Sequence, residues 1–202
     1  MSAPADGSGP SDVYYLETLD QLRVLADPLR YRMALLLEEP ATCAGLARAL
    51  GLTRAKAHYH LKLLETHGLV RPHSEALKAG IVEKYYVVRG RVLDFGRLMP
   101  ASEDRIPGNV APETVGAIGG FLAAMLQVSG ERTRTASAPD ALRKGHWFDF
   151  EATVDAAAFE EIRADLVALR ERVLSAGRAP DPAEGAVRFH LTNYLTPLEP
   201  RE

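Results

Sequence analysis

The sequence has a single cysteine, Cys43, among its 202 residues. It also has no apolar run near the roughly 20 residues that a membrane-spanning helix requires. One cysteine excludes an internal disulfide, and without a long apolar run we expect no membrane partner. Residues 1–12 lack the basic and then apolar pattern of a secretory signal, and they are small, polar and rich in Pro and Gly. This composition is typical of a disordered leader, and we expect a cytoplasmic protein.

The motifs of common catalytic sites are missing as well. There is no Gly-rich phosphate loop, no paired His/carboxylate metal spacing and no Gly-x-Ser-x-Gly. Asp149 and Glu151 would share one side of a strand, which is equally typical of a solvated face. We therefore expect no catalytic residue, no cofactor and no metal, in a protein that is not an enzyme.

The net charge of −3 is small, but it is unevenly distributed. Residues 54–91 contain eight Lys or Arg and three Glu, a net charge of +5, so the rest of the chain is acidic. A basic segment on an acidic body favours a local anionic partner such as a phosphate backbone. A solvated face with chance clustering of charge fits the same numbers.

Helical periodicity and cap residues predict four helices between residues 16 and 67. The first covers 16–26, and Asp27-Pro28 begins the second, which ends before Pro40. Thr42 caps the third, which Gly51 ends, and Thr53 caps the fourth, which ends at Gly68. The residues expected to face inward are Leu16, Leu19, Leu22, Val24, Leu25, Met33, Leu36, Leu37, Leu46, Ala47, Leu50, Ala57, Leu61 and Leu64.

Two strand-like runs follow, at 69–74 and 81–88, rich in β-branched and aromatic residues. They predict a hairpin over 70–88 whose loop, 75–80, is too long for a tight turn. A further short helix is expected at 91–99. The polar, Pro-containing segment 100–111 is the expected linker between two domains, 13–99 and 112–202.

The turn between the third and fourth helices is short and contains a glycine, as in a helix-turn-helix, whose second helix enters the major groove. On its outer face Arg54 and His58 can reach guanine acceptors, while Tyr59 and Lys62 can meet phosphate. A merely solvated His58 remains an alternative, and we expect His60 to pack against the neighbouring helix. The hairpin would be a wing over the phosphate backbone. The predicted DNA-binding residues are Thr53, Arg54, Lys56, His58, Tyr59, Lys62, Lys78 and Lys84.

The C-terminal half reads as helix, strand, helix, strand. A helix at 112–128 carries one stripe of Val115, Ile118, Leu122 and Met125 and another of Gly116, Gly120 and Ala124. The small stripe favours a close helix contact, although chance use of glycine is an alternative. Strands are expected at 146–154 and 186–195. Asp155 caps the helix between them, whose apolar seam is Phe159, Ile162, Leu166, Leu169 and Val173. The expected fold class is α+β: a winged helix-turn-helix domain followed by a small α/β domain.

These motifs, in this order, resemble the winged helix-turn-helix domain of ArsR-type transcriptional regulators. The resemblance covers residues 17–95 and rests on "LADPLRYRMALLL", "LARALGLTRAKAHYHLKLLETHGLV" and "GIVEKYYVV". It implies a homodimer that binds a palindromic operator on double-stranded DNA and usually represses. The second half resembles, more loosely, the C-terminal extension of members that do not sense metals, through "HLTNYLTPLEP".

Cys43 departs from the metal-sensing pattern, because such relatives place closely spaced cysteines in the helix before the turn. One thiolate is not a metal site. We expect Cys43 to be a small buried side chain, with a redox switch as the alternative.

Two further expectations concern partners. Two recognition helices on one face of DNA must lie about 34 Å apart, which favours a dimer. The candidate interface combines helix 16–26 with helix 115–128. A small-molecule effector is also possible, in a pocket lined by aromatic residues of the C-terminal half, although these can equally form its core: Trp147, Phe148, Phe150, Phe189 and Tyr194.

Overall fold

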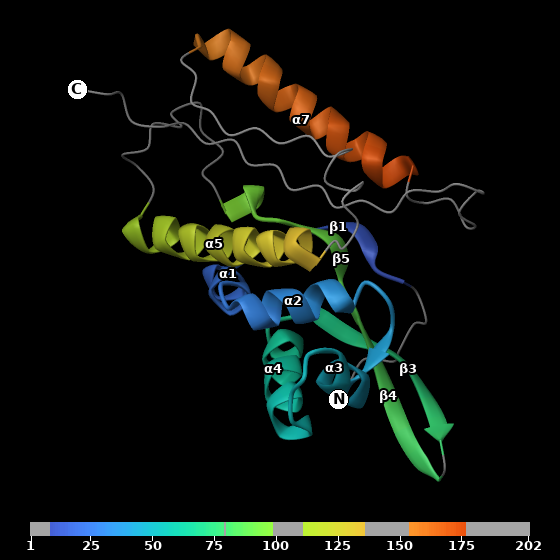
Figure 1. The fold of residues 1–202 in the computed structure, drawn as a ribbon. Helices are drawn as coiled ribbons and strands as arrows, with labels where there is room; N and C mark the ends of the chain where they lie inside the picture. The colour runs from blue at the N-terminus through green and yellow to red at the C-terminus, as the bar shows by residue number, and fades with distance from the viewer. Residues whose placement is uncertain (1–8, 79, 99–110, 136–153, 177–202) are drawn as a thin grey trace. The chain divides into compact units, whose positions relative to one another are not determined.

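The computed structural model describes residues 9–78, 80–98, 111–135 and 154–176 (Figure 1). The chain divides into two compact units, residues 1–130 and 131–202. The first unit mixes helices and strands around a helix-turn-helix, so the expected α+β class is confirmed. The strands expected at 146–154 and 186–195 lie outside the described residues.

The chain enters the first unit as a strand, not a helix. Strand β1 covers Ser11–Tyr15, and helix α1 covers only Leu19–Leu25. The Thr18 hydroxyl accepts a hydrogen bond from the backbone N–H of Gln21, so α1 begins three residues later than the periodicity predicted. Because the strand starts at Ser11, the last two residues of the expected leader, 11 and 12, belong to the fold.

Strand β1 pairs in parallel with β5 (Gly90–Asp94), in the register Ser11 with Gly90 and Tyr14 with Leu93. The helix expected at 91–99 is therefore wrong: β5 occupies its first half, and a single 3-10 turn, η1 (Gly96–Leu98), follows. The segment is short, so pairing with a distant strand outweighs its weak helical pattern.

The wing belongs to a second sheet of three strands, in the order β2 (Ala41–Thr42), β4 (Ile81–Val88), β3 (Val70–Lys78). All neighbours are antiparallel. The long loop expected at 75–80 is wrong, because β3 continues to Lys78, which pairs with Ile81. Only residues 79 and 80 connect the paired ends, and Gly80 takes a positive φ of 77°.

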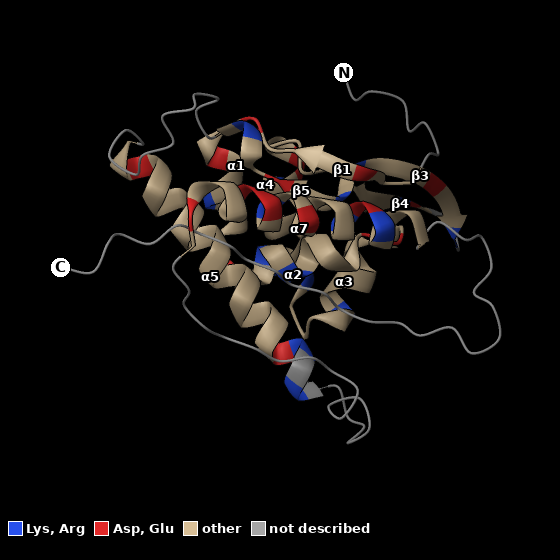
Figure 2. Cartoon of the chain, turned by 90° about the horizontal axis from the view of Figure 1, so that it is seen from above, with Lys and Arg blue, Asp and Glu red and all other residues tan. Residues whose placement is uncertain are grey.

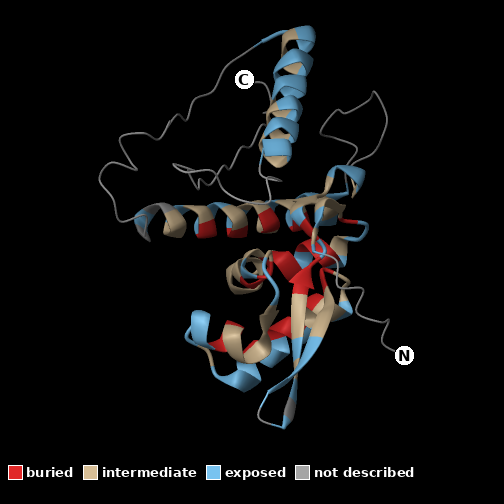
Figure 3. Cartoon of the chain, turned by 90° about the vertical axis from the view of Figure 1, so that its right-hand side faces the viewer, coloured by how far each residue is buried: buried red, intermediate tan, exposed pale blue. Residues whose placement is uncertain are grey.

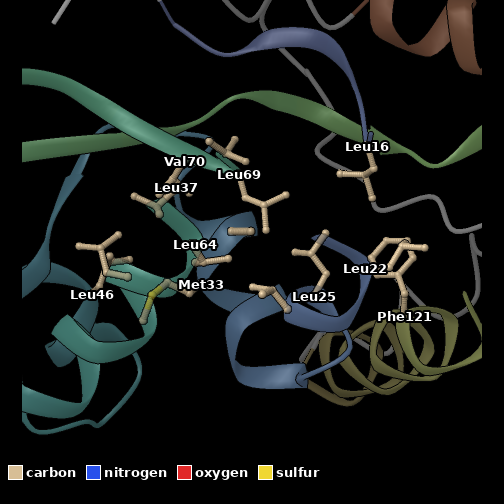
Figure 4. Close-up of a cluster of buried hydrophobic side chains, with 14 of the residues drawn as sticks. Leu16, Leu22, Leu25, Met33, Leu37, Leu46, Leu64, Leu69, Val70 and Phe121 are labelled. Carbon is tan, nitrogen blue, oxygen red and sulfur yellow. The ribbon is translucent and has the colours of Figure 1, made fainter. Parts of the chain in front are cut away.

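Asp27 is the N-cap of helix α2 (Pro28–Leu36), and its carboxylate accepts a hydrogen bond from the N–H of Leu29 at 2.8 Å. Met33 and Leu37 are buried as expected, but the inward position expected for Leu36 is wrong, because this side chain is 38% exposed. The core gathers the apolar faces of α1, α2, α3 (Cys43–Ala49) and α4 (Arg54–Thr66) with the first residues of β3 (Figure 4).

Helix α5 (Pro112–Thr135) packs onto this core, so the chain does not divide at the linker expected over 100–111. The Phe121 ring meets the rings of Tyr31 and Phe95 edge to face, with centroids 5.6 and 5.8 Å apart. Figure 3 shows the buried residues of α5 on the side that faces the rest of the unit. These residues are Ala117, Phe121, Ala124 and Val128, rather than the stripe expected through Val115.

The small residues of α5 serve this contact within the chain. A Cβ placed on Gly120 would lie 3.2 Å from the Cβ of Ala26, at the end of α1, so the expected close helix contact exists at this position. Gly116, by contrast, has nothing within 4 Å of its Cβ position. Part of this stripe, at Gly120, thus allows α5 to pack closely against α1 within the first unit.

In the second unit, the structure describes helix α7 (Ala156–Ala176). Asp155 caps it, as expected, by accepting from the N–H of Ala158 at 2.8 Å. None of the residues of α7 is buried, so the seam Phe159 to Val173 is at most half-buried. No described helix combines the length and the apolar character that a membrane span needs.

We predict that Gly90→Ala lowers the free energy of unfolding by about 1–3 kcal/mol. A Cβ at this position would lie 2.6 Å from both the backbone nitrogen and the Cβ of Tyr14, so β1 would have to move. Gly119→Ala is the matched control, because nothing lies within 4 Å of its Cβ position and alanine is favoured in a helix by about 1 kcal/mol. Urea denaturation measures both. A Gly90→Ala protein as stable as the parent would contradict the pairing of β1 with β5.

Candidate nucleic-acid interface

Side-chain caps define both helices of the helix-turn-helix. The Thr42 hydroxyl accepts from the N–H of Gly45 at 3.0 Å and begins α3, and the Thr53 hydroxyl accepts from the N–H of Lys56 at 3.3 Å and begins α4. Between them Gly51 has a positive φ of 64°, which turns the chain at the end of α3. The predicted caps and the predicted turn are all confirmed.

Helix α4 has one buried face and one exposed face. Ala57, Leu61 and Leu64 are buried against the core, as expected from their spacing. The six predicted DNA-binding residues of this segment are all exposed: Thr53, Arg54, Lys56, His58, Tyr59 and Lys62. Burial of the apolar stripe therefore turns every candidate polar side chain of α4 toward solvent.

The wing and the beginning of α4 lie at the same end of the first unit. Figure 1 shows the tip of the β3–β4 hairpin and the lower end of α4 on the side opposite α5. Lys78 and Lys84 are both exposed on the hairpin. The beginning of α4 and the wing tip thus lie at one end of the unit, as a surface that contacts one DNA duplex requires.

Two of the candidate cations already have an acidic partner. The Lys62 ammonium is 3.0 Å from a carboxylate oxygen of Glu65, and this hydrogen bond raises the pKa of Lys62. The Lys84 ammonium is 3.3 Å from Glu75 on the paired strand. Exposed ion pairs are weak because water and salt screen them, so a phosphate can replace the carboxylate at little cost. These pairs reduce the positive charge of the surface but do not block it.

The wing tip also exposes apolar side chains that sequence reasoning missed. Leu77 is 75% exposed and Val82 is 56% exposed, and the two residues pair across the hairpin. The sequence predicts a loop over 75–80 and therefore no face for Leu77, whereas the structure pairs this residue within the hairpin.

His60 is the buried polar residue of α4, as expected. Its Nδ1 has no hydrogen-bond partner among the described residues, and the Tyr59 ring meets its ring edge to face at 5.2 Å. Burial lowers the pKa of His60 below its ordinary value of 6.5, and the Asp27 carboxylate opposes this shift only in part. The imidazole therefore belongs to the packing of α4 and is held neutral.

Cys43 is half-buried at the first position of α3, with its sulfur 4.0 Å from the carbonyl oxygen of Arg54. Burial raises the pKa of its thiol, which favours the unreactive neutral form. Across the described ranges, no three His, Cys, Asp or Glu side chains gather as a metal site would need. The aromatic residues of the expected effector pocket, Trp147 to Tyr194, lie outside those ranges.

Residues 25–73 match the family of helix-turn-helix domains, from the end of α1 through α4 into β3. The match covers the two helices and the turn described above, and it supports binding to DNA and a role in transcription regulation. A comparison with curated proteins finds no match.

We predict that His60→Leu removes part of the dependence of stability on pH. Because the pKa of His60 is lowered in the folded chain, the unfolded chain takes up the proton first as the pH falls through about 6.5, and the parent loses stability. Leucine cannot titrate, so the unfolding free energy of the His60→Leu protein should fall less steeply than that of the parent between pH 7.5 and 5.5. Urea denaturation across this range measures the difference. Parallel curves for the two proteins would mean that His60 has the same pKa folded and unfolded.

Proposed function

We propose that this protein is an ArsR-type transcriptional regulator of the subgroup that does not sense metals. It binds a palindromic operator as a homodimer and represses transcription. One observation carries the proposal: the exposed residues of α4 include a set of cationic and hydrogen-bonding side chains, and the beginning of this helix lies at the same end of the unit as the wing tip. A major groove admits one such helix and presents a distinct donor and acceptor pattern for each base pair.

Within α4 the roles follow from position along the helix. Arg54 and His58 lie one turn apart at its beginning and contact base edges, with guanine N7 and O6 as the acceptors. Tyr59 and Lys62 contact phosphate, and Lys56 adds charge beside them. The Thr53 hydroxyl oxygen accepts a hydrogen bond from the N–H of Lys56. Its hydroxyl hydrogen can still donate to a phosphate oxygen at the beginning of the helix.

The wing contributes in two ways. Lys78, near the tip, and Lys84, after release from Glu75, neutralise phosphate charge. Leu77 and Val82 add apolar contact with deoxyribose at the tip, since their exposure is otherwise unexplained. The charged residues of 75–84 sum to zero, so the wing attracts DNA less strongly than the basic segment as a whole.

Dimerisation uses the outer face of α5. This helix has no charged residue between positions 114 and 130, as Figure 2 makes visible along its length. Val115 is 55% exposed and Leu126 is 50% exposed, with half-buried Leu122 between them at helical spacing. The expected share of α1 is withdrawn, because Leu22, Val24 and Leu25 are buried within their own chain.

Catalysis and metal sensing are not part of the proposal. Cys43 has no second thiol to complete a soft metal site, since the chain contains one cysteine. A ligand-responsive C-terminal half remains the alternative, and the aromatic residues expected to line its pocket lie outside the described ranges. A thermal-shift screen of the full chain against small metabolites tests it, and stabilisation by one of them would favour it.

We predict that Arg54→Ala and Lys78→Ala weaken DNA binding in different ways. Arg54→Ala should cost about 1–3 kcal/mol on the selected operator and relax the preference at one position of each half-site. Lys78→Ala should weaken the binding of all duplexes similarly. It should also reduce the slope of log K against log salt concentration by about 1, which corresponds to one phosphate contact. Fluorescence anisotropy with operator and scrambled duplexes at several salt concentrations measures both. Parent-like binding by both variants would exclude this face as the reading surface.

We predict that Leu126→Glu converts a dimer to a monomer, because the new carboxylate would be desolvated within the apolar face of α5. Val167→Glu is the matched control, because Val167 is also an exposed aliphatic residue on a helix, α7, and its change should leave the dimer intact. Size-exclusion chromatography with light scattering gives the mass. If Val167→Glu alone loses the dimer, the interface lies on α7 and not on α5. A monomeric parent would exclude the dimer.

A further inference from the structure

The Gln21 side chain joins three separate parts of the first unit. It is 6% exposed, and its Oε1 accepts from the backbone N–H groups of Glu17 at 2.7 Å and Thr18 at 3.2 Å. Its Nε2 donates to the carbonyl oxygen of His67 at 2.9 Å and to the hydroxyl oxygen of Tyr14 at 3.3 Å. One amide thus links β1, the beginning of α1 and the end of α4.

All hydrogen-bonding positions of this amide are used, and they fix its orientation. Oε1 has two acceptor positions and Nε2 has two donor hydrogens, which match the four contacts. The amide cannot flip, because Nε2 would then face two backbone N–H groups that only donate. The His67 carbonyl is likewise an obligatory acceptor, so the link to α4 has one geometry.

The contact falls where α4 ends. His67 is the C-cap of α4, and its carbonyl is one of the last groups without a partner inside the helix. Beyond it Gly68 has a positive φ of 68°, and the N–H of Leu69 donates to the carbonyl of Leu64 at 2.9 Å. The Tyr14 hydroxyl lies 3.7 Å from the Cβ position of Gly68, so β1 also touches this turn.

We propose that Gln21 is a positioning residue that sets the tilt of α4 in the major groove. The inference rests on the proposed function. From His67 back to Arg54 the helix is about 20 Å long, so a tilt of about 5° about its C-terminal end moves the Arg54 backbone by roughly 2 Å. Hydrogen bonds to base edges operate over about 2.7–3.2 Å and do not survive such a shift, whereas flexible Lys side chains still reach phosphate.

This geometry predicts a specific signature when Gln21 is changed. Sequence discrimination should fall, while binding to non-specific DNA and its dependence on salt should stay the same, because phosphate contacts carry both of the latter. A general loss of stability has a different signature, since unfolding lowers the active fraction for all duplexes equally.

The test compares Gln21→Met, which keeps the length and loses every hydrogen bond, with Gln21→Glu, which keeps the acceptor and loses the donor to His67. Gln127→Met is the matched control, the same change at an exposed position of α5. Val88→Ala, a buried position on β4, controls for lower stability. Each full-length protein is measured, under conditions where urea titration shows it folded, on the tightest duplex selected from a random library and on a scrambled duplex.

We expect the ratio of the two Kd values, scrambled over selected, to fall about tenfold in both Gln21 variants, the loss of roughly one base contact. The Kd for the scrambled duplex and the salt slope should equal those of the parent. Gln127→Met and Val88→Ala should keep the parent ratio. An unchanged ratio in both Gln21 variants, or an equal fall in Val88→Ala, overturns the positioning role while leaving the proposed function intact. A parent that does not discriminate between the duplexes overturns the proposed function and this inference with it.

Discussion

The burial of Ala57, Leu61 and Leu64 is the constraint on which the rest of the first unit depends. These three side chains attach α4 to the core, and full burial of each leucine contributes about 1.5–3 kcal/mol. Because burial of the apolar stripe fixes the rotation of a helix about its own axis, the same packing decides which residues face outward. Arg54 and His58 are exposed for this reason, and not because of any contact of their own.

Polar side chains then determine where each element begins and ends. Thr18, Asp27, Thr42 and Thr53 each satisfy backbone N–H groups at the start of a helix. Gln21 has the corresponding role at the end of α4, where its side chain donates a hydrogen bond to a carbonyl 46 residues away in the sequence. The orientation of α4 is therefore held at one end by a buried amide and along its length by apolar contact, which leaves its beginning free to meet a partner.

The surface that we propose for DNA is less cationic than the sequence alone indicated. Glu65 and Glu75 each pair with a lysine of the candidate set, and the wing carries exposed leucine and valine beside its lysines. Selectivity on such a surface has to come from a few well-placed base contacts rather than from charge. The precision with which α4 is held then matters more than the number of its cations.

Sequence reasoning predicted the parts of this surface that depend on neighbours in the chain. Both helices of the helix-turn-helix, their caps at Thr42 and Thr53 and the turn at Gly51 follow from side chains within four residues of the groups that they satisfy. The exposed positions from Arg54 to Lys62 follow from the period of the helix. Reasoning failed at the hairpin loop, where the strand character of 75–78 depends on pairing with β4.

The sequence by itself determined the boundaries of α3 and α4, the buried face of α4 and the class of the fold, because caps and periodicity act over one or two turns. Tertiary structure alone decided that residues 11–15 and 90–94 form a parallel pair, that α5 packs on the N-terminal core, and that Gln21 holds the end of α4. Each of these joins segments that are distant along the chain. Their free energy comes from pairing and burial that exist only once the chain has folded, and no local pattern records it.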